Sequence, residues 1–213
     1  MIKQHLVRLI KPKFFKTSQA MPRPAKILDV GIANSSYNEC KSIYSDAEYH
    51  GIDRDHLIDK PLSIKDKFLL LDMEKDDFRS QIDSDYDLII LNHVLEHLSN
   101  AEHVFVSLIS HLKSGGVLYA EYPSIKTAYR PKHYFSYHFH DDPTHKRFLS
   151  LLELANLTLE NNAAVISCGP ARTPLKTALA LPRALLKLLQ SREYGSELLH
   201  LKGKIEFIMI RKL

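Results

Sequence analysis

Residues 27–35 read Ile27-Leu28-Asp29-Val30-Gly31-Ile32-Ala33-Asn34-Ser35, and this stretch decides the fold. An apolar run ends in an acid and a glycine, and a turn of short residues follows. A second apolar run, Tyr49-His50-Gly51-Ile52-Asp53, ends in an acid 22 residues after the glycine. A strand, a tight turn, a helix and a second strand that ends in Asp are typical of a βαβ unit that binds a nucleoside.

The residues of the turn favour a nucleoside without phosphates. NAD needs glycines there so that the backbone can approach a pyrophosphate, but Ala33 and Ser35 occupy the second and third glycine positions. Asp29 would repel a pyrophosphate and attract a cation. S-adenosylmethionine (SAM) joins adenosine to a sulfonium and an amino-acid tail, so it fits this turn better. An NAD oxidoreductase is the less favoured alternative.

Three later segments repeat the plan of an apolar strand with a polar end or a tight turn. They are Phe68-Leu69-Leu70-Leu71-Asp72-Met73, the run from Asp85 to Leu98, and Leu112-Lys113-Ser114-Gly115-Gly116-Val117-Leu118-Tyr119-Ala120. Together with the first two strands they resemble the class I SAM-dependent methyltransferases, in the broad bacterial group that also holds ubiquinone-type and sugar methyltransferases. The resemblance covers residues 24–170. The segment from Asp142 to Phe148 also looks like the part that follows the sheet in that group.

Alternating apolar runs and amphipathic stretches predict an α/β fold, Rossmann-like and doubly wound, with helices on both faces of a mostly parallel seven-stranded sheet. The resemblance implies that the last strand is antiparallel. Residues 99–102 are expected to cap the second helix. We expect strands near 26–31, 48–53, 67–72, 86–92, 116–122, 162–168 and 204–211, and helices near 36–45, 99–113, 149–159 and 175–190.

Length and composition predict one domain over residues 1–213, and the resemblance implies that it is a methyltransferase domain. Within it we expect a basic N-terminal arm at 1–24, a lid or acceptor loop at 123–148, and a helical insertion at 170–203 before the last strand. The two cysteines lie far apart, no apolar stretch approaches the roughly 20 residues of a membrane span, and the first residues lack a signal core. These features predict a cytoplasmic protein.

Positive charge is concentrated at the N-terminus. Residues 1–28 hold seven Lys or Arg and no acid, although the net charge of the chain is only +4. We interpret this stretch as a solvated cap or partly ordered arm, with peripheral contact to an anionic membrane as the alternative. Nucleic acid is an unlikely partner at this net charge. The apolar helix around residues 181–189 is expected to pack on the domain or on a second copy in a homodimer.

The cofactor residues follow from one rule, that ligands of open α/β sheets bind beyond the carboxyl ends of the strands. The resemblance assigns the ribose hydroxyls to Asp53 and the adenine edge to Asp72 with the Met73 backbone. Gly31 would let the backbone pass the methionine tail, and Asp29 would favour its ammonium. For the acids the competing interpretation is a turn or helix cap. The predicted cofactor-binding residues are Asp29, Gly31, Ala33, Asp53, Arg54, Asp72, Met73 and Asn92.

Histidines supply the predicted chemistry. SAM carries an activated methyl group, so the enzyme must align the acceptor for in-line displacement, exclude water and remove a proton. His145, in the segment that resembles the family, is the first choice for this base, and His93 at the exit of the fourth strand is the second. Residues 129–145 combine histidines with aromatic side chains that would close over the site. The expected acceptor is a small molecule, a glycan or a lipid intermediate.

Two further functions stay open. His93-Val94-Leu95-Glu96-His97 is similar to the Glu-x-x-Glu-His metal motif of small-RNA 2′-O-methyltransferases, with His93 in place of the first Glu. His140 or His145 could complete such a site. A non-catalytic SAM-binding protein is the other alternative. Because position 93 departs from the motif, we assign no metal ligands and expect turnover without a metal.

Overall fold

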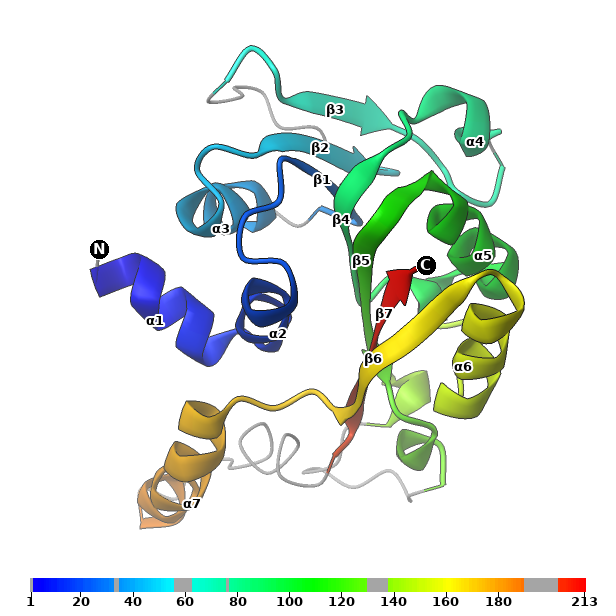
Figure 1. Ribbon diagram of the computed structural model, residues 1–213. Helices are drawn as coiled ribbons and strands as arrows, with labels where there is room; N and C mark the ends of the chain where they lie inside the picture. The colour runs from blue at the N-terminus through cyan, green and yellow to red at the C-terminus, as the bar shows by residue number, and fades with distance from the viewer. Residues whose placement is uncertain (1, 33–34, 56–62, 76, 130–137, 190–202) are drawn as a thin grey trace.

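The computed structural model describes residues 2–32, 35–55, 63–75, 77–129, 138–189 and 203–213 (Figure 1). A seven-stranded sheet in the order β3-β2-β1-β4-β5-β7-β6 forms the centre. β7 runs antiparallel to both β5 and β6, and the pairs β1–β2, β1–β4, β2–β3 and β4–β5 are parallel. The predicted Rossmann-like fold with an antiparallel last strand is therefore confirmed.

Every predicted strand and helix is present, with shifts at the ends. The strands are β1 Lys26–Val30, β2 Glu48–Asp53, β3 Lys67–Leu70, β4 Tyr86–Asn92, β5 Leu112–Pro123, β6 Ala163–Pro170 and β7 Ile205–Lys212. The α-helices are α1 Ile2–Ile10, α2 Pro12–Ala20, α3 Ser36–Ile43, α4 Phe78–Gln81, α5 Ala101–His111, α6 Leu151–Glu160 and α7 Pro174–Leu189. The 3₁₀ helices are η1 Leu95–His97, η2 Ile125–Thr127 and η3 Phe139–Asp141.

The cap predicted for α5 is wrong in detail. The N-cap residue is Asn100, and its side chain makes no capping hydrogen bond. The Ser99 backbone N–H is instead bound at 2.6 Å by the Glu74 carboxylate from the loop after β3. A long-range partner thus replaces the local cap that the Ser-Asn-Ala-Glu pattern indicated.

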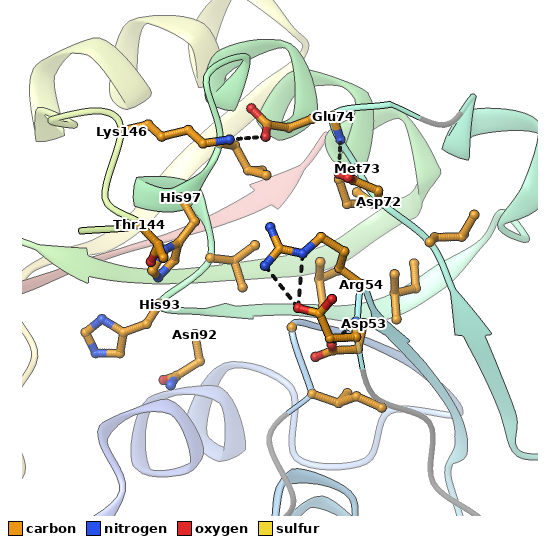
Figure 2. A pocket seen from close by; sticks show the side chains of 18 residues that line it. Asp53, Arg54, Asp72, Met73, Glu74, Asn92, His93, His97, Thr144 and Lys146 are labelled. Atoms are coloured by element: carbon orange, nitrogen blue, oxygen red, sulfur yellow. Dashed lines mark hydrogen bonds and ion pairs between the residues drawn. The ribbon is translucent and has the colours of Figure 1, made fainter. Parts of the chain in front are cut away.

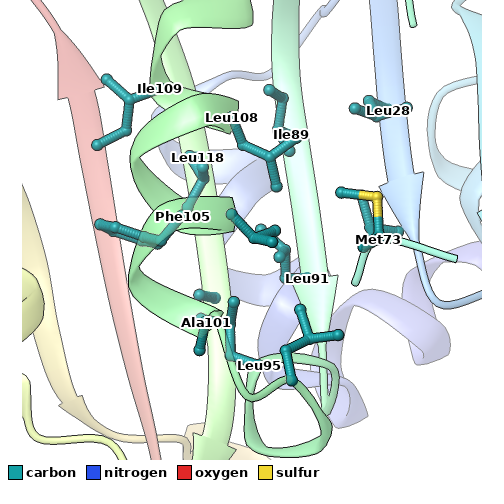
Figure 3. Packing of buried hydrophobic residues seen from close by; sticks show 14 of the residues in the cluster. Leu28, Met73, Ile89, Leu91, Leu95, Ala101, Phe105, Leu108, Ile109 and Leu118 are labelled. Carbon is teal, nitrogen blue, oxygen red and sulfur yellow. The ribbon is translucent and has the colours of Figure 1, made fainter. Parts of the chain in front are cut away.

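The central strands are buried on both faces, which is why their sequences are nearly continuous apolar runs. In β4, Ile89 and Leu91 point to one face while Leu88 and Ile90 point to the other. Figure 3 shows α5 lying on the first face, where Phe105 and Leu108 pack against the strand residues. α2 and α3 cover the second face, which includes Phe14 and Tyr37.

The basic N-terminal stretch forms α1 and α2 and packs beside α3 (Figure 1). Phe14 is fully buried, the Thr17 hydroxyl lies 2.9 Å from that of Tyr44, and Arg8 donates to the Ile43 carbonyl at 3.2 Å. The α2 helix therefore contributes to the core and supports the helix that follows the decisive turn. The basic residues of this stretch indicated a solvated cap or arm, and so these buried contacts were not predicted. Even Lys13, one of the basic residues, is buried.

The sheet order changes direction between β1 and β4, and this point locates the site. From β1 the chain moves outward to β2 and β3, then returns across to β4 and β5. Crossover connections leave the sheet on opposite sides there, so a crevice forms beyond the carboxyl ends of the two strands. Within the described residues, no helix has the length and apolar content to cross a membrane.

Candidate active site

A cavity of about 720 Å³ opens at the carboxyl ends of β1, β2, β3 and β4 (Figure 2). Six of the predicted cofactor residues line it, and so does the second-choice base. The lining comprises Val30, Gly31, Ile32, Ile52, Asp53, Arg54, Asp55, Leu71, Asp72, Met73, Glu74, Asn92, His93, Val94, His97, Leu98, Thr144 and Lys146. Ala33, another predicted cofactor residue, lies outside the described residues.

Gly31 is required by the geometry of the turn. Its φ of 74° lies in the left-handed region, and a Cβ added there would come within 2.4 Å of the Val94 Cγ2. Its N–H donates to the Ile52 carbonyl at 2.8 Å, which continues the β1–β2 pairing by one step. The backbone consequently turns sharply at the rim of the cavity with no side chain in the way.

Asp29 lies beneath this turn and does not line the cavity. Its side chain is buried and accepts a hydrogen bond from the Tyr49 hydroxyl at 2.9 Å. Burial raises the pKa of Asp29, while the charge of Lys13 and the Tyr49 hydrogen bond oppose that shift. Lys13 itself donates to the Ser36 hydroxyl at 3.3 Å. Asp29 thus supports the turn from below. Its buried carboxylate does not reach the cavity.

Asp53 and Asp72 stand at the ends of β2 and β3 and share one local pattern. Asp53 Oδ1 accepts the Asp55 N–H at 2.8 Å, and Asp72 Oδ1 accepts the Glu74 N–H at 3.0 Å. The bond from Glu74 lowers the pKa of Asp72, against a smaller effect of burial. Each acid therefore holds its own turn and also faces the cavity, so the two interpretations made from the sequence are compatible. Arg54 pairs with Asp55 at 3.0 Å.

The opposite wall comes from the segment after η3. Lys146 forms an ion pair with Glu74, and its backbone N–H donates to the Glu96 carbonyl at 2.8 Å. The Lys146 hydrogen bond, followed by the Ser99 N–H, lowers the pKa of Glu74 to about 2. Thr144 Oγ1 lies 2.8 Å from His97 Nδ1. These contacts join the loop after β3, the η1 helix and the 142–148 segment into one wall.

His93 is held between two carboxylates at the exit of β4. Its φ is 58°, its Nδ1 lies 2.9 Å from Glu96 Oε1, and its Nε2 lies 3.7 Å from Glu121 Oε1. Burial lowers the pKa of His93, but the hydrogen bonds and charges of Glu121 and Glu96 outweigh it and raise the pKa to about 10. His93 is therefore an imidazolium at neutral pH, although the sequence-based mechanism requires a neutral histidine.

His145, the first choice for a base, does not line the cavity. Its side chain is only 3% exposed, and its ring packs against those of His97 and Phe139. Its Nδ1 donates to the Phe139 carbonyl at 2.7 Å. The residue thus lies behind the wall that Thr144 and Lys146 present to the cavity.

A family model described as a methyltransferase domain matches residues 3–168, more than half of the chain. The chain belongs to this methyltransferase family. The match and the sheet order confirm the resemblance to class I SAM-dependent methyltransferases that the acid-tipped strands indicated. A comparison with curated proteins finds no match.

Solved structures share the fold of the methyltransferase. A SAM-dependent methyltransferase from Archaeoglobus fulgidus aligns with a TM-score of 0.58 and 16% identity over 98% of this chain and 94% of its own. An O-methyltransferase from a Brevibacillus brevis trans-AT PKS multienzyme, in complex with S-adenosyl-L-homocysteine, aligns with a TM-score of 0.56 and 17% identity over 90% of this chain and 67% of its own. Phosphoethanolamine N-methyltransferase 2 from Haemonchus contortus, in complex with SAM, aligns with a TM-score of 0.62 and 11% identity over 92% of this chain and 50% of its own.

Sequence reasoning missed four residues of the methyltransferase site and its surroundings. Glu74 and Lys146 pair across 72 positions, and Lys13 reaches the first turn from α2. Glu121 lies two residues before the end of β5, directly opposite Asn92 in the sheet register and buried beside His93. Glu121 had a usable signal, because an acid near the carboxyl end of a central strand follows the same rule that identified Asp53.

Proposed function

We propose that this methyltransferase binds SAM in the carboxyl-end cavity and methylates a small molecule, a glycan or a lipid intermediate. The observation that carries the proposal is the convergence of Gly31, Asp53, Asp72 and Asn92 on one cavity from four strand ends. The fit to SAM rests on the turn at Gly31, whose backbone borders the cavity without a side chain, because a Cβ there would collide with Val94. It also rests on the acids, which match hydroxyl and amino groups and would repel phosphates.

Each cofactor residue has a distinct role in this proposal. The Asp53 carboxylate accepts hydrogen bonds from the ribose hydroxyls, and Asp72 with the Met73 backbone binds the adenine edge. The turn that contains Gly31 and Ala33 borders the amino-acid tail, and Asn92 faces the same end. Arg54 borders the adenosine. Asp29 acts through the turn, since its carboxylate is committed to Tyr49.

The proposed mechanism depends on positioning and on the charge state of His93. SAM, when bound, supplies an electrophilic methyl group. Near neutral pH the imidazolium of His93, fixed by Glu96 and Glu121, can donate a hydrogen bond that orients an acceptor oxygen or nitrogen. Only the minor neutral form can take a proton from the acceptor. If His93 is the base, the rate of methylation should therefore increase with pH up to about 10.

His93 replaces His145 as the preferred base in this proposal. His93 lines the cavity, whereas the His145 ring is buried behind Thr144 with Nδ1 bound to a backbone carbonyl. A proton acceptor must come within hydrogen-bond reach of the group that loses the proton, and of these two histidines His93 satisfies this condition without movement of the wall.

The test is calorimetry of SAM and S-adenosylhomocysteine binding to Asp53→Ala. Loss of charge-assisted hydrogen bonds should weaken SAM by about 1.5–3 kcal/mol. Asp46→Ala is the matched control, because Asp46 is an exposed carboxylate that precedes β2 at its other end. Equal SAM affinity in Asp53→Ala and wild type would contradict the ribose assignment. NADH binding by the wild type would favour an oxidoreductase instead.

A further inference from the structure

At the wall of the cavity, three groups that are metal ligands in other proteins come together. One ligand atom each from Glu96, His97 and His145 lies within 4.8 Å of the other two. Glu96 is only 1% exposed, and its Oε2 has no hydrogen-bond partner among the described residues. A buried carboxylate oxygen without a donor is costly, so Oε2 favours a cation or a donor of its own, in addition to the His93 ring that binds Oε1.

The hydrogen bonds of the two histidines define their tautomers. His145 Nδ1 faces the Phe139 carbonyl at 2.7 Å, and a carbonyl can only accept, so Nδ1 carries the proton. Thr144 Oγ1 donates to Asp142 Oδ1 at 2.6 Å and therefore accepts from His97 Nδ1 at 2.8 Å. In both neutral rings the remaining lone pair is on Nε2.

We propose that Glu96, His97 and His145 bind one divalent transition-metal ion of the zinc type. Two imidazoles and one carboxylate are a ligand set that Zn²⁺ uses, whereas Mg²⁺ and Ca²⁺ prefer oxygen ligands alone. Both rings already have the outer partners that metal-bound histidines have, an N–H directed to a carbonyl or hydroxyl oxygen. Asp142 Oδ2, 3.8 Å from His145 Nε2, offers a further oxygen.

The ligand set differs from the motif noted in the sequence. His93 is not a ligand, because its Nδ1 binds Glu96 Oε1 at 2.9 Å and so leaves Oε2 for the metal. His140 is exposed, packs against His138 and is not a member of this group of three. His145 therefore completes the site.

The metal would connect two segments distant in sequence. Glu96 and His97 belong to η1, and His145 belongs to the segment whose Thr144 and Lys146 line the cavity. The ion would hold this wall closed behind the cofactor and takes no part in methyl transfer. The proposal goes beyond the proposed function, since the site exists without SAM.

The experiment uses the untagged full chain, stripped with a chelator and then dialysed against Zn²⁺ or Co²⁺ without SAM. Wild type should retain one equivalent of Zn²⁺, and Co²⁺ should give a visible d–d spectrum that Zn²⁺ abolishes. His145→Gln and His97→Gln should lose both signals. His103→Ala, which removes an exposed histidine on α5, should keep them.

Absence of metal binding in wild type would overturn the proposal whatever the variants do. So would equal Zn²⁺ retention by His145→Gln and wild type. If a variant fails to fold, Zn²⁺ should still raise the melting temperature of the stripped wild type and of His103→Ala; no shift in either would overturn the proposal. SAM calorimetry on the stripped protein tests the methyltransferase assignment separately.

Discussion

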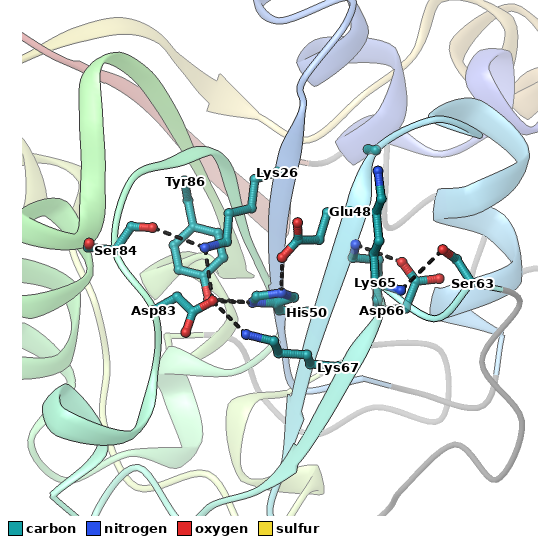
Figure 4. A network of polar contacts seen from close by, with 12 residues as sticks. Lys26, Glu48, His50, Ser63, Lys65, Asp66, Lys67, Asp83, Ser84 and Tyr86 are labelled. Carbon is teal, nitrogen blue, oxygen red and sulfur yellow. Dashed lines mark hydrogen bonds and ion pairs between the residues drawn. The ribbon is translucent and has the colours of Figure 1, made fainter.

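The two ends of the sheet each hold a histidine among acids, and they differ in how their charges are satisfied. At the amino end, Asp83 accepts from Lys26 and from Lys67 at 2.9 Å each (Figure 4). His50 lies 2.6 Å from a Glu48 oxygen and 2.8 Å from the Tyr86 hydroxyl. At the carboxyl end, His93 faces two carboxylates, and a buried oxygen of Glu96 has no partner among the described residues.

This difference separates a structural network from a functional site. Burial lowers the pKa of His50, with Glu48 opposing, so that ring is favoured as the neutral form between an acceptor and a donor. Lys26 and Lys67 supply the positive charge around Asp83, so this carboxylate is paired within the protein. At the carboxyl end the protein leaves acceptors in excess. Such a site is expected to be stabilised when it binds a cation or a positively charged ligand group.

The largest expected effect is that of Gly31→Ala at the carboxyl end. A left-handed non-glycine residue costs about 1–2 kcal/mol, and displacing Val94 costs about 1–3 kcal/mol more. Gly115→Ala is the matched control near the amino end of β5, because its φ is 79° and nothing lies within 4 Å of an added Cβ. Urea unfolding should show the larger loss for Gly31→Ala, and calorimetry should show weakened SAM binding only there. Equal losses in the two variants would contradict the close-approach argument.

The next effect concerns the charge of His93. Its folded pKa is raised to about 10, so its ion pairs stabilise the fold below the unfolded value of about 6.5 and this contribution is lost as pH rises through 10. His93→Gln should cost about 1–2 kcal/mol at pH 6, discounted because the side chain is 34% exposed. The difference from wild type should shrink toward pH 10. Nitrogen NMR showing a neutral His93 ring at pH 8 would refute this.

The smallest effect is expected at the amino end, from Asp83→Asn. Lys67 and Lys26 lower the pKa of Asp83 to about 2, so its stabilisation is present above pH 4 and is lost as pH falls toward 2. Because the side chain is 39% exposed, the loss at pH 7 should be about 0.5–1 kcal/mol. SAM affinity should not change. Weakened SAM binding would mean that the two ends are coupled, against the present account.

Much of the fold was readable from the sequence because its signals are local. Asp29-x-Gly31, the acid of Asp53 and the apolar runs predicted every strand and the sheet class. The cofactor end of the cavity followed, since strand ends meet at one edge. The site chemistry was harder, because it depends on contacts between distant segments. The charge of His93 depends on Glu121, and the burial of His145 depends on Phe139.

The N-terminal stretch shows the limit of composition as evidence. Seven basic residues and no acid indicated a solvated cap or arm, yet α2 buries Phe14 and Thr17 against the sheet and α3. Net charge describes the exposed side chains of a helix and says little about its apolar stripe.

Hydrogen exchange with and without S-adenosylhomocysteine tests the central claim most directly, because it compares both ends of the sheet in one measurement. The account predicts protection at residues 30–32, 52–55, 71–74, 92–94 and 97–98, which line the cavity. It predicts no change at residues 82–87, which hold the Asp83 network at the other end. Protection at the amino end, or an unchanged carboxyl end under saturating ligand, would contradict it.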